Sequence, residues 1–152
     1  GESQTLTESA SGFNQLYYFA TPKIVSASND LEGEKLYSKY HQCYVNNFEL
    51  LMEELLGGET LNSVFYPSTV FVNSPPKGFE DYVRAKIDGE QSCVRLAENW
   101  PVKFISPRLP RLSTDQNQSI IPENHSDNAE TMLPYLREML RGKEPCVQPS
   151  IL

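Results

Sequence analysis

The chain is poor in glycine and carries no long apolar run. Its 8 glycines form neither a Gly-x-Gly-x-x-Gly nor a Gly-x-x-Gly-x-x-Gly pattern, so the loop that holds a dinucleotide pyrophosphate at a helix N-terminus is missing. Apolar stretches fall well short of the ~20 residues that cross a bilayer. The net charge of -7 argues against a nucleic-acid or anionic-membrane partner, because phosphate contacts require clustered Lys and Arg.

Cysteine and histidine are equally scarce. Cys43, Cys93 and Cys146 are odd in number and widely spaced, which predicts neither a disulfide framework nor a zinc site. Reduced thiols are typical of a cytoplasmic protein, and this is the location that we expect. His41 and His125 have no partner at metal or triad spacing, so we predict no metal.

The apolar pattern predicts an α/β fold in which strands alternate with helices. Residues 1–12, rich in Ser, Thr and Glu, are predicted to be flexible and do not resemble a secretory signal. Residues 61–72 are predicted to form a buried strand, and the strands at residues 16–21 and 102–112, the latter with its Arg/Pro-containing turn, are implied by the family resemblance described below. The predicted helices cover residues 30–56 with Asp30 as cap, 79–99 ending at Trp100, and 132–141 with Pro134 in the first turn.

Tyr82-x-x-x-Lys86 is the most informative motif, because it places a phenol and an ammonium one helical turn apart on one face. A nearby ammonium favours the phenolate, which lowers the tyrosine pKa from about 10 toward the range of efficient acid catalysis. The pair by itself is also compatible with an amphipathic helix whose Tyr packs at a rim and whose Lys is solvated. The preceding residues favour the functional interpretation.

A strand of β-branched and aromatic residues ends in Ser68 and Thr69, which lie 14 and 13 positions before Tyr82. Adjacent side chains of a strand face opposite sides, so only one of these hydroxyls can face the Tyr82 site. We choose Ser68, with Thr69 as the alternative. A loop over residues 73–78 then leads into the helix that carries Tyr82.

A strand, a Ser or Thr, a loop and a helical Tyr82-x-x-x-Lys86 together resemble the active-site segment of the short-chain dehydrogenase/reductase family. Residues 16–21 look like its fourth strand, and residues 102–112 are similar to its sixth strand in extended and thioester-reductase-like members. The resemblance covers residues 14–115. It implies the C-terminal half of a Rossmann-like, doubly wound parallel sheet over residues 13–115, with about three strands and crossover helices, followed by a loop, short helix and tail over residues 116–152.

The resemblance implies an NAD(P)-dependent reductase that transfers hydride to a carbonyl, such as an aldehyde or acyl thioester, with NADP favoured over NAD. Tyr82 would protonate the alkoxide, Lys86 would hold the cofactor ribose and lower the Tyr82 pKa, and Ser68 would bond the carbonyl oxygen. Further residues expected beside the cofactor are Ala20, Pro107 and Arg108. Since the glycine-rich half is missing, the chain should not turn over alone.

Several alternatives stay open. Tyr44 falls where many members carry an asparagine of a proton relay, so Asn46 and Asn47 are better read as ordinary polar helix residues. Arg108 and Arg111 could face a phosphate or carboxylate, or be surface arginines. The chain could also be a non-catalytic, reductase-like scaffold. A third reading is a fragment that folds only with its missing half or a second copy, because an open strand edge needs a partner.

Overall fold

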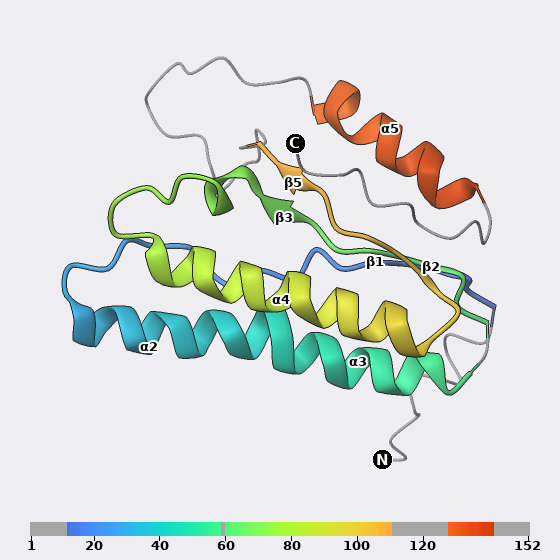
Figure 1. Ribbon diagram of the computed structural model, residues 1–152, viewed down its shortest axis with the longest axis horizontal. Helices are drawn as coiled ribbons and strands as arrows, with labels where there is room; N and C mark the ends of the chain where they lie inside the picture. The colour runs from blue at the N-terminus through green and yellow to red at the C-terminus, as the bar shows by residue number, and fades with distance from the viewer. Residues whose placement is uncertain (1–11, 59, 111–127, 142–152) are drawn as a thin grey trace, which may run out of the picture.

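The computed structural model describes residues 12–58, 60–110 and 128–141, which form a mixed α/β structure (Figure 1). Some predictions concern residues outside the described part of the chain. They are those for residues 1–11, for Arg111, for the loop up to residue 127, and for the tail from residue 142, which includes Cys146. Among the helices of the described part, none is both long and apolar enough to cross a membrane.

A small parallel sheet forms the centre of the fold. Its strands, in spatial order, are β1 (Gln15–Tyr17), β2 (Ser63–Phe65) and β4 (Lys103–Ile105). Beyond β2 and β4, two shorter strands form a parallel pair, β3 (Ser68–Thr69) and β5 (Arg108–Leu109). The strands predicted at 61–72 and 102–112 are therefore each split in two. Pro67 and Pro107 stand at the splits, where each lacks the N–H that a continuous strand would use.

The two helical segments between the strands lie where the periodicity predicts them. The first consists of α2 (Asp30–His41), the π-helical turn η1 (Gln42–Asn46) and α3 (Asn47–Leu56), and the second is α4 (Glu80–Asn99). The predicted cap of the first helix is wrong. Asn29 caps it, because its side-chain oxygen accepts the Glu32 N–H at 3.0 Å. The π-helical turn was not predicted, since spacings of three and four residues continue through it.

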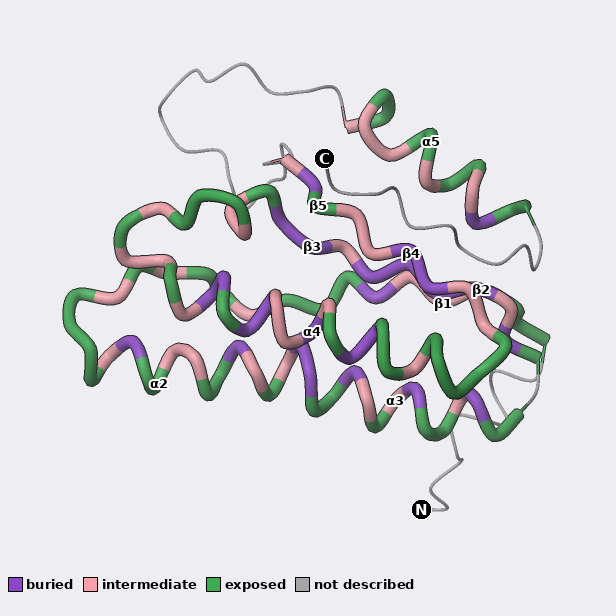
Figure 2. Tube along the Cα trace, viewed as in Figure 1, coloured by how far each residue is buried: buried purple, intermediate pink, exposed green. Residues whose placement is uncertain are grey.

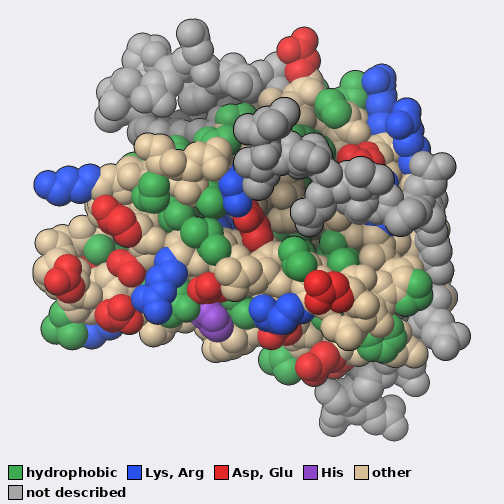
Figure 3. Space-filling view, in the orientation of Figure 1, with side chains coloured by type: hydrophobic (Ala, Val, Ile, Leu, Met, Phe, Trp, Pro, Cys, Tyr) green, Lys and Arg blue, Asp and Glu red, His purple; other side chains and the backbone are tan. Residues whose placement is uncertain are grey.

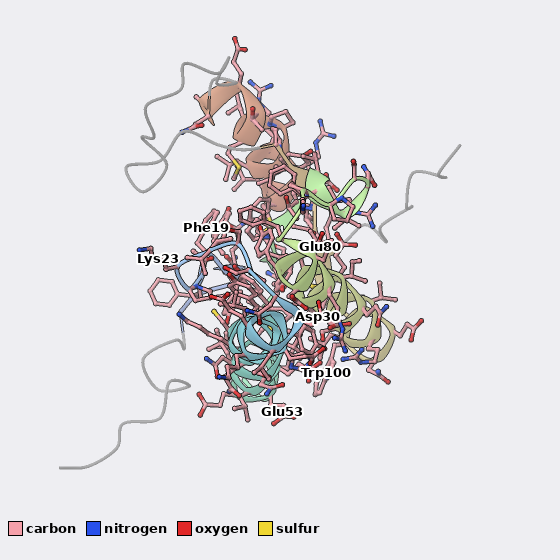
Figure 4. All side chains as sticks on the ribbon, turned by 90° about the vertical axis from the view of Figure 1, so that its left-hand side faces the viewer. Phe19, Lys23, Asp30, Glu53, Glu80 and Trp100 are labelled. Atoms are coloured by element: carbon pink, nitrogen blue, oxygen red, sulfur yellow. The ribbon has the colours of Figure 1, made fainter. Side chains whose placement is uncertain are left out.

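Three layers result, with α2, α3 and α4 on one face of the sheet and α5 (Asn128–Leu140) on the other (Figure 1). Neighbouring strand residues point to opposite faces, so Val64 packs with the long helices and Phe65 packs with Met139 of α5. Figure 2 shows the buried positions on the strands and on the facing sides of the helices. Figure 4 views the molecule from the end where α2 and α4 begin, at Asp30 and Glu80.

The short helix begins earlier than predicted. Pro134 lies inside α5 rather than in its first turn, because the helix starts at Asn128. A proline inside a helix removes one backbone hydrogen bond. The apolar contacts of Met132, Tyr135 and Met139 with the sheet side of the core offset that loss.

Gly89 lets α4 approach the rest of the core. A Cβ atom at Gly89 would lie 1.9 Å from the Tyr66 hydroxyl oxygen and 3.2 Å from the Tyr44 carbonyl oxygen. The Tyr66 hydroxyl donates to that carbonyl at 2.9 Å, so the space beside Gly89 is filled by a buried hydrogen bond.

We expect Gly89→Ala to lower the free energy of unfolding by about 2 kcal/mol, although alanine is the better helix former by ~1 kcal/mol. The added methyl group must displace the Tyr66 hydroxyl from its buried acceptor. Urea unfolding followed by circular dichroism measures the change. Gly57→Ala is the matched control, because its added Cβ would meet its nearest atom at 3.6 Å, and it should cost little. Equal stabilities of the two variants would contradict the close packing at Gly89.

Candidate functional site

Three side chains of α4, each one turn from the next, contact three successive residues of the chain between β2 and η2. The Thr69 hydroxyl lies close enough to Tyr82 to lower its pKa, and it also accepts the Phe71 N–H at 3.3 Å. Lys86 Nζ donates to the carbonyl oxygen of Pro67 at 2.8 Å. A spacing of four residues puts such side chains on one helical face, so one stripe of α4 binds this strand segment.

The structure separates the two candidate hydroxyls. Thr69, the alternative, lies beside Tyr82, whereas the Ser68 hydroxyl donates to the Glu90 carboxylate two helical turns further along. Of the two adjacent hydroxyls, Thr69 is thus beside Tyr82, whereas Ser68, the residue chosen from the sequence, faces Glu90. Glu90 was missed by the sequence reasoning, although its place four residues after Lys86 was a signal that could have found it.

Lys86 is buried, with 8% of its surface exposed. Its ammonium lies 3.9 Å from the ring centroid of Tyr44 and 5.4 Å from that of Tyr66. Burial lowers the pKa of Lys86 to about 8, while the neighbouring Cys43, Cys93 and Glu90 act in the opposite direction. One carbonyl and two aromatic faces thus replace the water around this cation.

Tyr82 is also buried, with 8% exposed, and burial raises its pKa above the ordinary value. The neighbouring Thr69 hydroxyl works against this rise, and the coulombic effect of Tyr40 adds to it. The expected lowering of the Tyr82 pKa by Lys86 is not what the structure shows. The physical reason is that the Lys86 ammonium faces the Pro67 carbonyl and the Tyr44 ring.

Aromatic rings enclose the pair. Tyr82 meets Tyr40 and Tyr44 edge to face, with ring centroids 5.8 and 6.0 Å apart. The Tyr44 hydroxyl lies 2.6 Å from Thr21 Oγ1, in the segment that follows β1. Burial raises the pKa of Tyr44 as well. Both phenols are therefore neutral over the physiological pH range.

The residues expected beside a cofactor lie past the carboxyl ends of the parallel strands, the edge where α/β sheets bind ligands. Ala20 is exposed beyond β1, and Pro107 lies half-buried between β4 and β5. Arg108 is exposed, but its Nε and Nη2 donate to Glu90 at 3.0 and 2.8 Å, and its Nη1 donates to Asn73 at 3.0 Å. Glu90 raises the pKa of Arg108. The guanidinium is thus already bound on three nitrogens.

The remaining polar candidates are surface groups. Asn46 and Asn47 are exposed and share hydrogen bonds with Gln42. On the face over α2, α3 and α4 that Figure 3 shows, acidic and basic side chains lie interspersed. Within the described ranges, no group of three His, Cys, Asp or Glu side chains could hold a metal ion.

No model of a known protein family matches the chain, and no curated protein matches it significantly. The candidate site therefore stands on its own geometry: a buried phenol, a neighbouring hydroxyl and a buried ammonium at the carboxyl edge of a parallel sheet.

The buried ammonium predicts a pH effect on stability. The pKa of Lys86 is about 8 in the folded chain against an ordinary 10.5, so between these values the unfolded chain binds the proton and the folded chain does not. Raising the pH through this window therefore stabilises the fold. Relative to Lys86→Met, the wild type should gain about 2 kcal/mol from about pH 7.5 to about pH 9.5.

Urea unfolding of both proteins over this pH range measures the difference. Burial raises the pKa values of Cys43 and Cys93 and the charge of Lys86 lowers them, so all proteins are compared in a Cys43→Ala, Cys93→Ala background in which these thiols do not titrate. The exposed Lys39 on α2 supplies the control, and Lys39→Met should run parallel to the wild type. If the free energies of unfolding of wild type and Lys86→Met change in parallel with pH, the pKa of Lys86 is not lowered in the folded chain.

Proposed function

We propose that this chain is the catalytic-residue half of a cytoplasmic, NAD(P)-dependent reductase of the short-chain dehydrogenase/reductase type, acting on a carbonyl substrate. The observation that carries the proposal is the placement of Thr69 beside Tyr82 at the carboxyl edge of the sheet, with Lys86 one helical turn away. A phenol with a hydroxyl partner and a neighbouring amine is the donor set that carbonyl reduction needs.

The residues at this edge fit the nicotinamide end of a dinucleotide. Tyr82, Lys86 and the exposed Ala20 would lie along the nicotinamide and its ribose, with Pro107 at the border. Arg108 fits less well than expected, because Glu90 and Asn73 already occupy its guanidinium. The bound cofactor, NADPH in preference to NADH, would supply the hydride for the carbonyl carbon.

The chain's own residues would manage the proton and the developing charge. Tyr82 gives its hydroxyl proton to the carbonyl oxygen as the C–H bond forms, which yields an alcohol from an aldehyde or ketone. Thr69, in place of Ser68, donates a hydrogen bond to the same oxygen and stabilises the negative charge. Lys86, one helical turn from Tyr82, would hold the ribose hydroxyls. The surrounding tyrosine rings exclude water from these groups.

The order of the strands supports a half-sheet that is completed by another segment. The chain moves in one direction across the sheet, β1-β2-β4, and both crossover segments cover the same face, as in one half of a doubly wound fold. Within the described residues β1 pairs with β2 alone. Phe19, just past β1, is 55% exposed while its ring lies 5.7 Å from that of Phe65. A dinucleotide-binding half would pair with the open edge of β1 and cover this ring.

The alternative function is a non-catalytic, reductase-like scaffold inside a larger assembly. The observation that favours it is the burial of the site, since Tyr82 and Lys86 are each 8% exposed and burial raises the pKa of the phenol. In this reading, the same contacts hold α4 on the sheet and do nothing further.

The functional test is expression of the chain together with a candidate dinucleotide-binding half. NADPH binding is followed by fluorescence, and turnover by oxidation of NADPH with aldehydes and acyl thioesters. We expect Tyr82→Phe to lower kcat by roughly 10²–10⁴-fold while the NADPH Kd stays unchanged, because only the transferable proton is removed. Tyr37→Phe, which deletes a phenol bonded to Asp88 outside the site, is the control. Cofactor binding with undiminished Tyr82→Phe turnover would favour the scaffold.

The same assay decides between the hydroxyls. Thr69→Val keeps the shape of the side chain and should lower kcat by roughly 10²-fold, as expected when one donor to the oxyanion is lost. Ser68→Ala should leave kcat nearly unchanged, since Ser68 bonds Glu90. The reverse ranking would assign the role to Ser68 after all.

A further inference from the structure

Tyr44 contacts both members of the Tyr82–Lys86 pair. Its ring centroid lies 3.9 Å from Lys86 Nζ and 6.0 Å from the ring centroid of Tyr82. Its hydroxyl lies 2.6 Å from Thr21 Oγ1. One buried side chain therefore joins the site on α4 to the segment that follows β1.

The position of the Tyr44 ring depends on the π-helical turn η1. The Asn47 N–H donates to the Gln42 carbonyl, five residues back, which inserts one extra residue into the helical turn. The carbonyls of Cys43 and Tyr44 accept hydrogen bonds from the hydroxyls of Tyr18 and Tyr66, at 2.6 and 2.9 Å. These bonds tie the turn to the ends of β1 and β2. π-Helical turns are frequent at functional sites, where they redirect a side chain.

The face of an aromatic ring attracts a cation, most strongly where water is excluded. Lys86 has two such partners, but Tyr44 is the nearer one, at 3.9 Å against 5.4 Å for Tyr66. The Tyr44 hydroxyl has no part in this contact, since it points to Thr21. The ring of Tyr44 thus contacts Lys86 and its hydroxyl contacts Thr21. Substitution by Phe removes only the second contact, whereas substitution by Leu removes both.

We propose that Tyr44 is a positioning residue whose ring seats the Lys86 ammonium against the Pro67 carbonyl, one helical turn from Tyr82, while its hydroxyl anchors the segment after β1. This inference rests on the proposed reductase function for its catalytic meaning, but the seat itself is a property of the chain alone. Tyr44 takes the place along the helix where an asparagine would be expected from the family resemblance. At this position the Tyr44 ring, which contacts Lys86 directly, stands where the resemblance implies the amide side chain of an asparagine.

The seat is tested by NMR on the full chain carrying ¹³C-labelled lysine. Protons above an aromatic ring shift upfield, so the Lys86 Hε signals should lie upfield of the other lysines in wild type and in Tyr44→Phe. In Tyr44→Leu they should move to the position of the exposed lysines. The matched control is Tyr37→Leu, which removes the ring lying 3.8 Å from Arg84 and should leave the Lys86 signals in place.

Two results would overturn the seat: Lys86 Hε signals at the exposed position in the wild type, or upfield signals that persist in folded Tyr44→Leu. Circular dichroism reports whether each variant folds. If Tyr44→Leu is unfolded, Tyr44→Met refills the space with a flexible side chain and serves in its place. The wild-type spectrum is decisive in either case.

The catalytic meaning is tested in the reconstituted reductase. Tyr44→Phe should keep kcat within a few-fold, whereas Tyr44→Leu should lower kcat by roughly tenfold to hundredfold and shift its pH profile, because a displaced and hydrated ammonium no longer holds the cofactor ribose in place. An active wild type with an unaffected Tyr44→Leu rate and profile would overturn the positioning role and leave the reductase standing. A wild type that binds NADPH but lacks turnover would remove the proposed function, while the NMR result still decides the seat.

Discussion

The buried ammonium of Lys86 is the constraint on which the rest of this structure depends. A cation without water needs partners, and here they are the Pro67 carbonyl at 2.8 Å and the ring of Tyr44 at 3.9 Å. Both partners hold their places only if α4 lies close against the strand segment and the π-helical turn. Gly89 permits that approach, since a side chain there would collide with the Tyr66 hydroxyl. The free energy cost of desolvating Lys86 is thus offset by contacts that form when α4, the strand segment and the π-helical turn pack together.

The same stripe of α4 orders the candidate site. Each of its three polar side chains contacts one residue of the strand segment: Tyr82 contacts Thr69, Lys86 contacts Pro67, and Glu90 contacts Ser68. The bidentate pair of Glu90 with Arg108 extends this contact to the neighbouring strand β5. The contacted residues Pro67, Ser68, Thr69 and Arg108 follow the carboxyl ends of β2 and β4, two strands of the central parallel sheet. A sheet whose chain crosses in one direction brings those ends together on one edge, which explains why a site can form there from residues far apart in sequence.

What could be predicted of the site follows from helical geometry alone. Tyr82 and Lys86 share a face because they are one turn apart, and the structure places both against the same strand segment. The choice between Ser68 and Thr69 could not be made in this way. Alternation along a strand says that they differ in direction, but only the packing of α4 decides that Glu90 meets Ser68. The direction of the Lys86 ammonium likewise depends on the ring of Tyr44, which a linear pattern does not locate.

Periodicity by itself determined the two long helices, because the local spacing of apolar residues sets the buried face of a helix. Tertiary structure alone decided the π-helical turn, the splitting of the strands at Pro67 and Pro107, and the start of α5 ahead of Pro134. Each of these is a compromise between a local preference and contacts with residues distant in sequence. Such contacts exist only once the layers have packed, so no local sequence pattern predicts them.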